Sequence, residues 1–176
     1  MDIRWVEERD YEQIMTLENE VWNDTNTPMI TTYQSTEEFA QSLEYRKVAV
    51  AVEDGTVLGF IDAFQMYRGI NTNFSLTVGM AVSPSARRKG VASQLLKWVI
   101  QYAEGENYNK ISLRVLATNP AAVALYKKSG FVVEGVLKHE FFLNNQWADD
   151  IVDFCQEYGH NKWKPCSDLN RIDVSI

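Results

Sequence analysis

Two adjoining segments with different apolar periodicity constrain the fold more than any other feature of this chain. In the first, large apolar residues alternate with small or polar ones, as in a strand with one buried face; they are Phe74, Leu76, Val78, Met80 and Val82. In the second, apolar residues recur at helical spacing and predict a helix over 90–104; they are Val91, Leu95, Leu96, Val99, Ile100 and Ala103. Pro84 lies between the segments and ends the strand, because proline has no N–H to donate. A strand that leads directly into a helix predicts an α/β domain.

The turn between this strand and this helix is basic and contains a glycine, in the run Arg87-Arg88-Lys89-Gly90. A helix N-terminus exposes unpaired N–H groups and the positive end of the helix dipole. Gly90 would let an anion approach the backbone, so the turn predicts a site for a pyrophosphate. On charge alone, a solvated basic helix start explains the same residues. A Walker loop and a dinucleotide fingerprint both fail to match, because each needs further residues around Gly90 that are absent.

A second motif begins at Asn119, a good helix N-cap, and ends near Gly130, a good C-terminal stop. The basic turn resembles the acetyl-coenzyme A loop of the GNAT (GCN5-related) N-acetyltransferases, Gln/Arg-x-x-Gly-x-Gly/Ala, through Arg87, Gly90 and Ala92. The second motif resembles the family pattern Asn-x-x-Ala-x-x-x-Tyr-x-x-x-Gly-Phe through Asn119, Ala122, Tyr126, Gly130 and Phe131. Because the separation of the two motifs also fits, the resemblance extends over roughly residues 74–155.

The resemblance implies acetyl-coenzyme A as the acetyl donor. In the family the pantetheine arm pairs with a strand backbone as an added strand does, which here implies contacts with Met80, Ala81 and Val82. The pyrophosphate would be held by the turn and the start of the helix, namely Arg87, Arg88, Lys89, Gly90, Val91 and Ala92. The resemblance also places Asn119 and Ala122 beside the pantetheine. Each has a structural alternative, since Asn119 can serve as an N-cap alone and Ala122 as an ordinary helix residue.

Tyr126 is the predicted catalytic residue. Direct attack of an amine on a thioester, in a ternary complex, releases a thiolate, to which a phenol can donate a proton or a hydrogen bond. The alternative is that Tyr126 is a core aromatic residue. The general base is left unassigned, because strand 74–83 carries no carboxylate of the kind that many family members use. A water relay is one candidate, and the acids elsewhere are Asp62, Glu134, Glu140, Asp149 and Asp150.

The acceptor pocket is expected to form from the loop after the first helix and from the last hairpin. Its candidates are Trp22, Asp24, Asn26, Thr27, Tyr33, His139, Phe141, Trp147 and Asp149, although the same aromatic residues could simply fill a core. The net charge of −7 favours a cationic acceptor, such as a primary amine or a peptide N-terminus, and disfavours nucleic acid. The segment after Phe131 resembles both the ribosomal-protein and the polyamine branches of the family. A non-catalytic acyl-coenzyme A sensor is the alternative function, and a longer acyl donor stays open.

The predicted order of elements is β-α-α-β-β-β-α-β-α-β-β, which resembles the GNAT fold, with a mixed and largely antiparallel central sheet. Strands 74–83 and 111–116 should be parallel, joined by the helix between them. Residues 1–158 are expected to form one domain, and residues 159–176 a polar, irregular extension. No apolar run is long enough to span a membrane, and the start does not resemble a signal peptide, so a cytoplasmic protein is expected. The two cysteines and two histidines form no metal motif, so no metal is expected. A homodimer is expected by analogy with the family alone.

Overall fold

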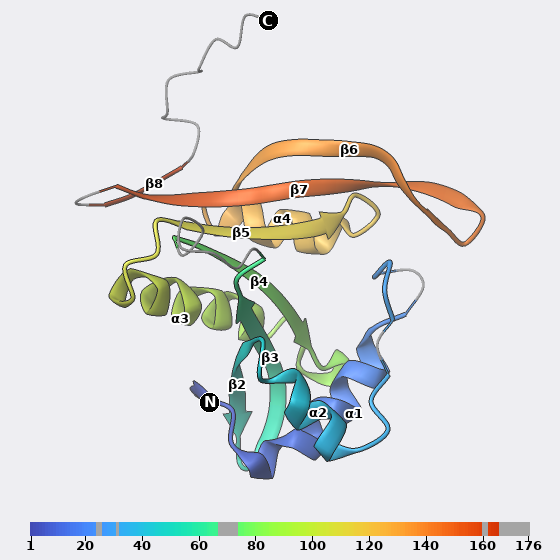
Figure 1. Cartoon of the computed structure of the whole chain (residues 1–176), viewed down its shortest axis with the longest axis vertical. Coiled ribbons are helices and arrows are strands. Elements are labelled where there is room, and N and C mark those ends of the chain that lie inside the picture. The colour runs from blue at the N-terminus through green and yellow to red at the C-terminus, as the bar shows by residue number, and fades with distance from the viewer. Residues whose placement is uncertain (24–25, 31, 67–73, 160–161, 166–176) are drawn as a thin grey trace, which may run out of the picture.

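The computed structural model describes residues 1–23, 26–30, 32–66, 74–159 and 162–165. In these residues the strands form one eight-stranded sheet with the order β1-β2-β3-β4-β5-β7-β6, in which β8 pairs with β7 (Figure 1). The strands are β1 (Asp2–Trp5), β2 (Lys47–Glu53), β3 (Thr56–Phe64), β4 (Ser75–Val82), β5 (Lys110–Leu116), β6 (Val132–Leu143), β7 (Gln146–Gly159) and β8 (Lys162–Pro165). The pairing of β4 with β5 is parallel, as expected, and the other pairs are antiparallel. The mixed sheet and the order of its elements therefore confirm the α/β fold.

Helices cover both faces of the sheet, and alternation along the strands explains how. On one face, α1 (Tyr11–Val21) and α2 (Thr36–Ser42) pack over a core that includes Ile14, Leu17, Phe39, Val48, Val50 and Phe60. On the other face, α3 (Val91–Gly105) and α4 (Pro120–Lys128) pack over Ile61, Leu76, Val78, Leu95, Val99 and Ile111. Phe60 and Ile61 are neighbours on β3 but belong to opposite cores, because successive side chains of a strand point to opposite faces.

The parallel pairing is short, and the two strands part after it. It joins Ser75–Thr77 of β4 to Lys110–Ser112 of β5. Beyond this point β5 continues along β7, whereas β4 turns away with β3 (Figure 1). We call this divergence the β4–β5 fork. Its apex is marked by the buried hydroxyls of Thr77 and Ser112, whose Oγ1 and Oγ atoms lie 3.3 Å apart.

The C-terminal part departs from the sequence expectation. Irregular structure was expected from about residue 159. This expectation is wrong for Lys162–Pro165, which forms β8 and pairs with residues 156–159 of β7. The reason is that β6 reaches along β7 only as far as the pair Val132↔Cys155, which leaves the backbone of β7 beyond it open to another strand. Residues 160–161 and 166–176 lie outside the described residues, so the division into a domain and an extension stays a prediction.

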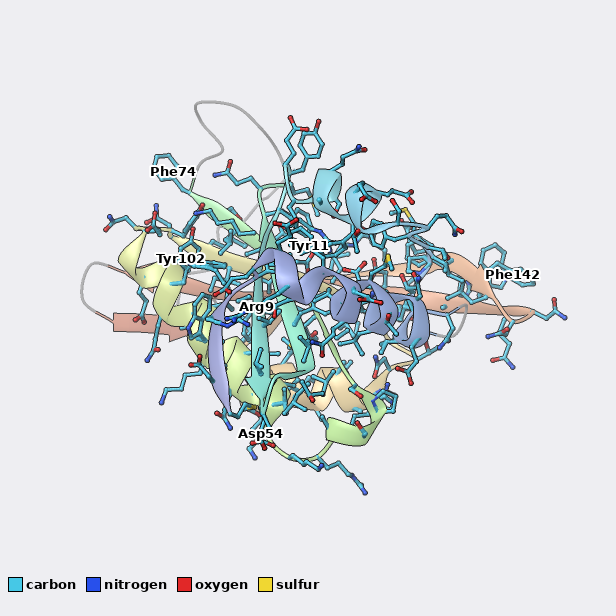
Figure 2. The ribbon with its side chains drawn as sticks, turned by 90° about the horizontal axis from the view of Figure 1, so that it is seen from below. Arg9, Tyr11, Asp54, Phe74, Tyr102 and Phe142 are labelled. Carbon is cyan, nitrogen blue, oxygen red and sulfur yellow. The ribbon has the colours of Figure 1, made fainter. Side chains whose placement is uncertain are left out.

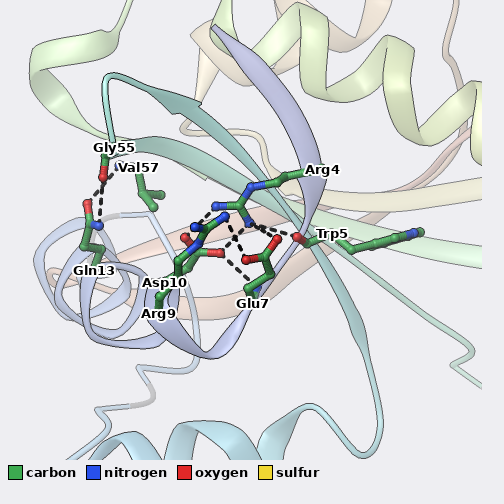
Figure 3. A network of polar contacts seen from close by, with 8 residues as sticks. All are labelled: Arg4, Trp5, Glu7, Arg9, Asp10, Gln13, Gly55 and Val57. Carbon is green, nitrogen blue, oxygen red and sulfur yellow. Dashed lines mark hydrogen bonds and ion pairs between the residues drawn. The ribbon is translucent and has the colours of Figure 1, made fainter.

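The N-terminal strand is tied to the first helix by an arginine–aspartate pair (Figure 3). Both terminal nitrogens of Arg4 donate to the Asp10 carboxylate, at 2.6 and 2.9 Å, and the Glu7 N–H donates to it at 2.8 Å. Asp10 stands at the start of α1 as expected, but its side chain binds Arg4 and the preceding turn and does not cap α1. Gln13 then fixes α1 to the turn between β2 and β3, because its amide donates to the Gly55 carbonyl and accepts from the N–H of Val57 (Figure 3).

None of the helices in the described ranges has both the length and the apolar character that a membrane span requires.

Candidate active site

The basic turn has the conformation that its glycine predicts. A short 3₁₀ turn, η2 (Pro84–Ala86), follows β4, and Arg88 and Gly90 then take positive φ angles of 62° and 85°. Gly90 is the N-cap of α3, so this helix begins without a capping side chain, and its first N–H groups face the turn. The side chains of Arg87, Arg88 and Lys89 are exposed around it. The local geometry thus fits an anion bound by backbone donors and surrounded by positive charge.

The start of α3 divides the predicted pyrophosphate residues into two kinds. The side chain of Val91 is buried in the core under α3, and Ala92 is half-buried. These two residues can therefore meet a ligand with their backbone, whereas the three basic side chains can meet it with their charges. Contact with coenzyme A stays a prediction for all of them.

The end of β4 has one paired edge and one open edge. Met80, Ala81 and Val82 pair with β3 through Ile61, Phe60 and Gly59. On the side of the β4–β5 fork, the described residues supply no strand for this part of β4. A ligand with amide groups can pair with such an edge, whatever the side chains are. The open edge leads from the apex of the β4–β5 fork to the basic turn.

The second motif forms a capped helix, α4. The Oδ1 atom of Asn119 accepts a hydrogen bond of 3.2 Å from the N–H of Ala122, which confirms that Asn119 caps α4. Pro120 is the first residue of α4, and Gly130 follows the helix with a φ of 91°. The cap explains Asn119 structurally, while the expected contacts of Asn119 and Ala122 with a ligand stay predictions.

Tyr126 lies on α4 and is almost buried, with 7% of its surface exposed. Its ring packs near that of Phe131, with the centroids 6.0 Å apart. Burial raises the pKa of Tyr126 to about 12, and the negative charge of Asp62 contributes to the same shift. The phenol is therefore fully protonated at neutral pH and can donate a hydrogen bond. A thiolate formed near it would be stabilised by that bond. Full proton transfer from so weak an acid to the thiolate is uphill, because an ordinary thiol has a pKa of about 8.5.

Most of the candidate general bases are ion-paired on β6 and β7, away from the turn. Glu134 accepts from Lys110 at 2.6 Å, and Asp149 accepts from Lys138 at 2.7 Å. Asp150, which is buried, accepts from Nε of Arg114 at 2.7 Å, and Glu140 lies 3.9 Å from the same guanidinium. The hydrogen bond from Lys138 lowers the pKa of the Asp149 carboxyl, which makes Asp149 a weaker base.

Asp62 differs from these acids. It lies on β3, directly opposite Gly79 of β4, and its side chain is 15% exposed. A Cβ atom on Gly79 would come within 2.7 Å of Oδ1 of Asp62, so the carboxylate occupies space that a glycine leaves free. Burial raises the pKa of Asp62, although Arg46 opposes the shift. Asp62 is thus a basic carboxylate beside the β4–β5 fork, on the sheet face that carries α1 and α2.

Two further charged residues, which were not predicted from the sequence, complete this cluster. Nη2 of Arg46 donates to Glu18 at 2.9 Å, and Nη1 of Arg46 lies 3.5 Å from Asp62. Glu18 comes from α1, where it belongs to the buried face together with Ile14 and Leu17. That position could have identified Glu18 from the sequence, because an acid on the apolar stripe of a helix must have a partner in the folded protein. Burial raises the pKa of Glu18, and its pairing with Arg46 opposes the shift.

The expected acceptor residues separate into two groups. Tyr33 lies beside the charged cluster, where its hydroxyl accepts from Arg46 at 3.1 Å. Asn26 supports its own loop, donating to the Val21 carbonyl at 2.7 Å, and Asp24 lies outside the described residues. Trp22 and Thr27 are partly exposed in the same loop.

The hairpin residues form the second group. Trp147 is 60% exposed and contacts the rings of His139 and Phe142, of which Phe142 lies at the outer end of the β6–β7 hairpin (Figure 2). Phe141 is partly buried on β6, where it pairs with Ala148. A common pocket formed by the hairpin and the loop after α1 stays a prediction.

Known proteins resemble this chain in sequence. Spermidine N(1)-acetyltransferase of Vibrio cholerae is 41% identical over 69 residues, which make up 39% of this chain and 40% of that enzyme. The chain therefore matches well under half of the length of this relative. L-amino acid N-acetyltransferase AaaT of Escherichia coli is 29% identical over 151 residues, which make up 84% of this chain and 92% of that enzyme.

Solved structures and the family pattern agree with these relatives. The crystal structure of smu.2055 from Streptococcus mutans has a TM-score of 0.83 and 31% identity, covering 89% of this chain and 99% of that one. A GNAT superfamily phosphinothricin acetyltransferase from Sinorhizobium meliloti, solved in complex with AcCoA, has a TM-score of 0.81 and 22% identity, over 90% of this chain and 88% of that one, and shows the same fold. Residues 11–131, more than half of the sequence, match the sequence model of the Acetyltransferase (GNAT) family. The two motifs, the forked sheet and these matches together show that the chain belongs to the GNAT acetyltransferase family.

Proposed function

We propose that this protein is an N-acetyltransferase that moves the acetyl group of acetyl-coenzyme A to a primary amine. The observation that carries the proposal is the continuous path from the basic turn, along the open edge of β4, to the apex of the β4–β5 fork. Backbone donors at Gly90 and the start of α3 would hold the pyrophosphate, and the edge formed by Met80, Ala81 and Val82 would pair with the pantetheine. The solved complex of a fold relative with AcCoA supports this choice of donor.

Tyr126 is proposed to act on the leaving sulfur. Its phenol would donate a hydrogen bond to the thiolate as the carbon–sulfur bond breaks, and its high pKa keeps that proton in place before reaction. The amine would attack in a ternary complex. The relatives differ in the amines that their names state, since one acetylates spermidine and another L-amino acids, so the acceptor is proposed as a class of primary amines. A cytoplasmic location and a homodimer stay expectations from sequence and analogy.

The direct test is release of coenzyme A thiol from acetyl-coenzyme A in the presence of spermidine, L-amino acids and a short peptide with a free N-terminus. We expect at least one of these amines to be acetylated. Tyr126→Phe should lower kcat by about 10²-fold or more, while the Kd of acetyl-coenzyme A measured by calorimetry stays the same. If none of the amines is acetylated and Tyr126→Phe still binds acetyl-coenzyme A with the wild-type Kd, the result would instead support a non-catalytic sensor of acyl-coenzyme A.

The turn can be tested separately. Gly90→Ala should weaken binding of coenzyme A, because φ at this residue is 85° and a Cβ strains the conformation that opens α3. Gly105→Ala is the matched control, since nothing lies within 4 Å of a Cβ there. Equal affinities in both variants would contradict the role given to the turn.

A further inference from the structure

We propose that Asp62 is the general base of acetyl transfer, which receives the ammonium group of the acceptor and takes its proton. This inference rests on the proposed acetyltransferase function and deepens it. It assigns the proton transfer that the sequence leaves open, and it explains why an ionisable residue interrupts the apolar strand β3.

The position of Asp62 is the first argument. Gly79 of β4 is its partner across the sheet, and it lies two residues beyond Thr77, which marks the apex of the β4–β5 fork. Because Gly79 has no Cβ, the Asp62 carboxylate can rest against the backbone of β4, where Oδ1 would lie 2.7 Å from a Cβ. β4 has no carboxylate of its own. The Asp62 carboxylate, from the neighbouring strand β3, lies against β4 at the point where the acetyl group is proposed to lie.

The balance of charge in the cluster is the second argument. Two carboxylates share one guanidinium, and Glu18 holds it more closely, with a hydrogen bond of 2.9 Å against a separation of 3.5 Å for Asp62. Arg46 also donates to Tyr33 and Ser42, so its Nη2 is fully engaged away from Asp62. Asp62 therefore carries surplus negative charge in a largely buried place, which an incoming ammonium group would compensate.

The exposure of the two acids separates their roles. The side chain of Glu18 is 4% exposed, whereas that of Asp62 is 15% exposed, so an acceptor can reach Asp62 more readily. The Nε atom of Arg46 is buried with no hydrogen-bond partner among the described residues. A cluster with an unsatisfied donor and an excess of acid is poorly arranged for stability, as expected where a site serves a reaction.

The chemistry requires a base that is ionised but stronger than an ordinary aspartate. Burial raises the pKa of Asp62 and so brings the carboxylate closer in basicity to the group that it must deprotonate. Glu18 from α1, Arg46 before β2 and Tyr126 from α4 interact electrostatically with Asp62. Tyr33, from the loop after α1, belongs to the same cluster through its hydrogen bond with Arg46. Arg46 is a positioning residue here, because it acts through the Asp62 carboxylate and is given no contact with the acceptor or the thioester.

The proposed step conserves protons and electron pairs. One N–H bond of the acceptor ammonium breaks, and its proton passes to an oxygen of Asp62. The freed lone pair forms the carbon–nitrogen bond at the thioester carbonyl, and the carbon–sulfur bond then breaks with its electron pair on sulfur. A second proton from nitrogen reaches the sulfur, which Tyr126 stabilises by its hydrogen bond, and Asp62 later releases the first proton to solvent.

The main test compares Asp62→Asn with Glu20→Gln, which removes an exposed acid from α1 two residues beyond Glu18. The readouts are kcat and KM for an amine that the wild type acetylates, the Kd of acetyl-coenzyme A, and Tm. We expect Asp62→Asn to lower kcat by about 10²–10⁴-fold with unchanged Kd, and Glu20→Gln to behave as the wild type. Unchanged kcat in folded Asp62→Asn, or an effect on KM alone, would overturn the proposal.

A second measurement uses the wild type and needs no variant. A base is needed only when the acceptor is an ammonium ion, so an acceptor made weakly basic by fluorine atoms next to its amine carbon should react without one. For the ordinary amine, kcat/KM should fall as pH drops through the raised pKa of Asp62, and for the fluorinated amine this acid limb should disappear. An identical acid limb with both acceptors would overturn the assignment.

These outcomes are distinct from a failure of the proposed function. If the wild type acetylates no amine and binds no acetyl-coenzyme A, the function itself is wrong. If the wild type is active and Asp62→Asn is equally active, the function stands and only the base is wrong.

Discussion

Arg4–Asp10 and Arg46–Asp62 are both arginine–aspartate pairs, but they differ in construction. Arg4 binds Asp10 through two hydrogen bonds, at 2.6 and 2.9 Å, and a backbone N–H adds a third (Figure 3). Arg46 approaches Asp62 through a single contact of 3.5 Å and binds Glu18 more closely. As a result the pKa of Asp10 is lowered, chiefly by the hydrogen bond from Arg4, whereas burial raises the pKa of Asp62.

Under the proposal for Asp62, one pair of residue types serves stability in one place and chemistry in another. A carboxylate whose ionised form is fully hydrogen-bonded stabilises the folded state, and it makes a poor base for the same reason. A carboxylate that is buried and shares its arginine with a second acid stays reactive at the expense of stability.

Arg46→Met should have the largest effect. Removing the guanidinium leaves Glu18 and Asp62 buried together without a cation, which we expect to lower the free energy of unfolding by about 3–5 kcal/mol at neutral pH. Arg4→Met should lower it by about 1–3 kcal/mol, because Arg4 is more exposed and Asp10 keeps its hydrogen bond from Glu7. Urea unfolding of both variants would measure this, and equal losses would contradict the contrast.

Asp10→Asn and Asp62→Asn should change stability in opposite directions. Asp10→Asn loses charge-assisted hydrogen bonds, and we expect a decrease of about 1–3 kcal/mol in the free energy of unfolding with kcat unchanged. Asp62→Asn removes a buried charge while leaving Arg46 bound to Glu18, so its Tm should rise above that of the wild type while its activity falls. Thermal melts together with kcat would test both expectations. A Tm of Asp62→Asn below that of the wild type would contradict the contrast between the two pairs.

Gly79→Ala should disturb Asp62 without altering its charge. The new Cβ would lie 2.7 Å from Oδ1 and displace the carboxylate, so we expect kcat to fall by about tenfold, with acetyl-coenzyme A still bound. Gly135→Ala on β6 is the matched control, because nothing lies within 4 Å of its Cβ. Equal turnover in the two variants would show that the space beside Gly79 does not matter.

The smallest effects are expected in the pH dependence of stability. The folded pKa of Asp10 is lowered, so its contribution is fully present above the unfolded pKa and is lost as pH falls through the folded pKa. The folded pKa of Asp62 is raised, so the protonated form favours folding, and this advantage is lost as pH rises through that pKa. The difference in free energy of unfolding between the wild type and Asp10→Asn should therefore shrink in acid. The difference between the wild type and Asp62→Asn should grow as pH rises. Parallel pH profiles of the two variants would contradict this assignment.

The sequence predicted the elements that depend on neighbouring residues. Period-two alternation marked β4, helical spacing marked α3, and Asn119 and Gly130 marked the ends of α4. The positive φ of Gly90 also follows from local chemistry, because glycine adopts it without steric strain. These signals were enough to place the basic turn, the capped helix and the resemblance to the family.

The tertiary structure alone decided the charged cluster around Asp62. Glu18 and Arg46 are separated by 28 residues, and no local pattern predicts that they bind each other or that Asp62 shares the guanidinium. The space for Asp62 depends on a glycine on another strand, and β8 exists because β6 stops short along β7. The physical reason is that capping, turn conformation and periodicity are set within a few residues of chain, whereas burial, charge balance and strand pairing are set by segments that meet only after folding.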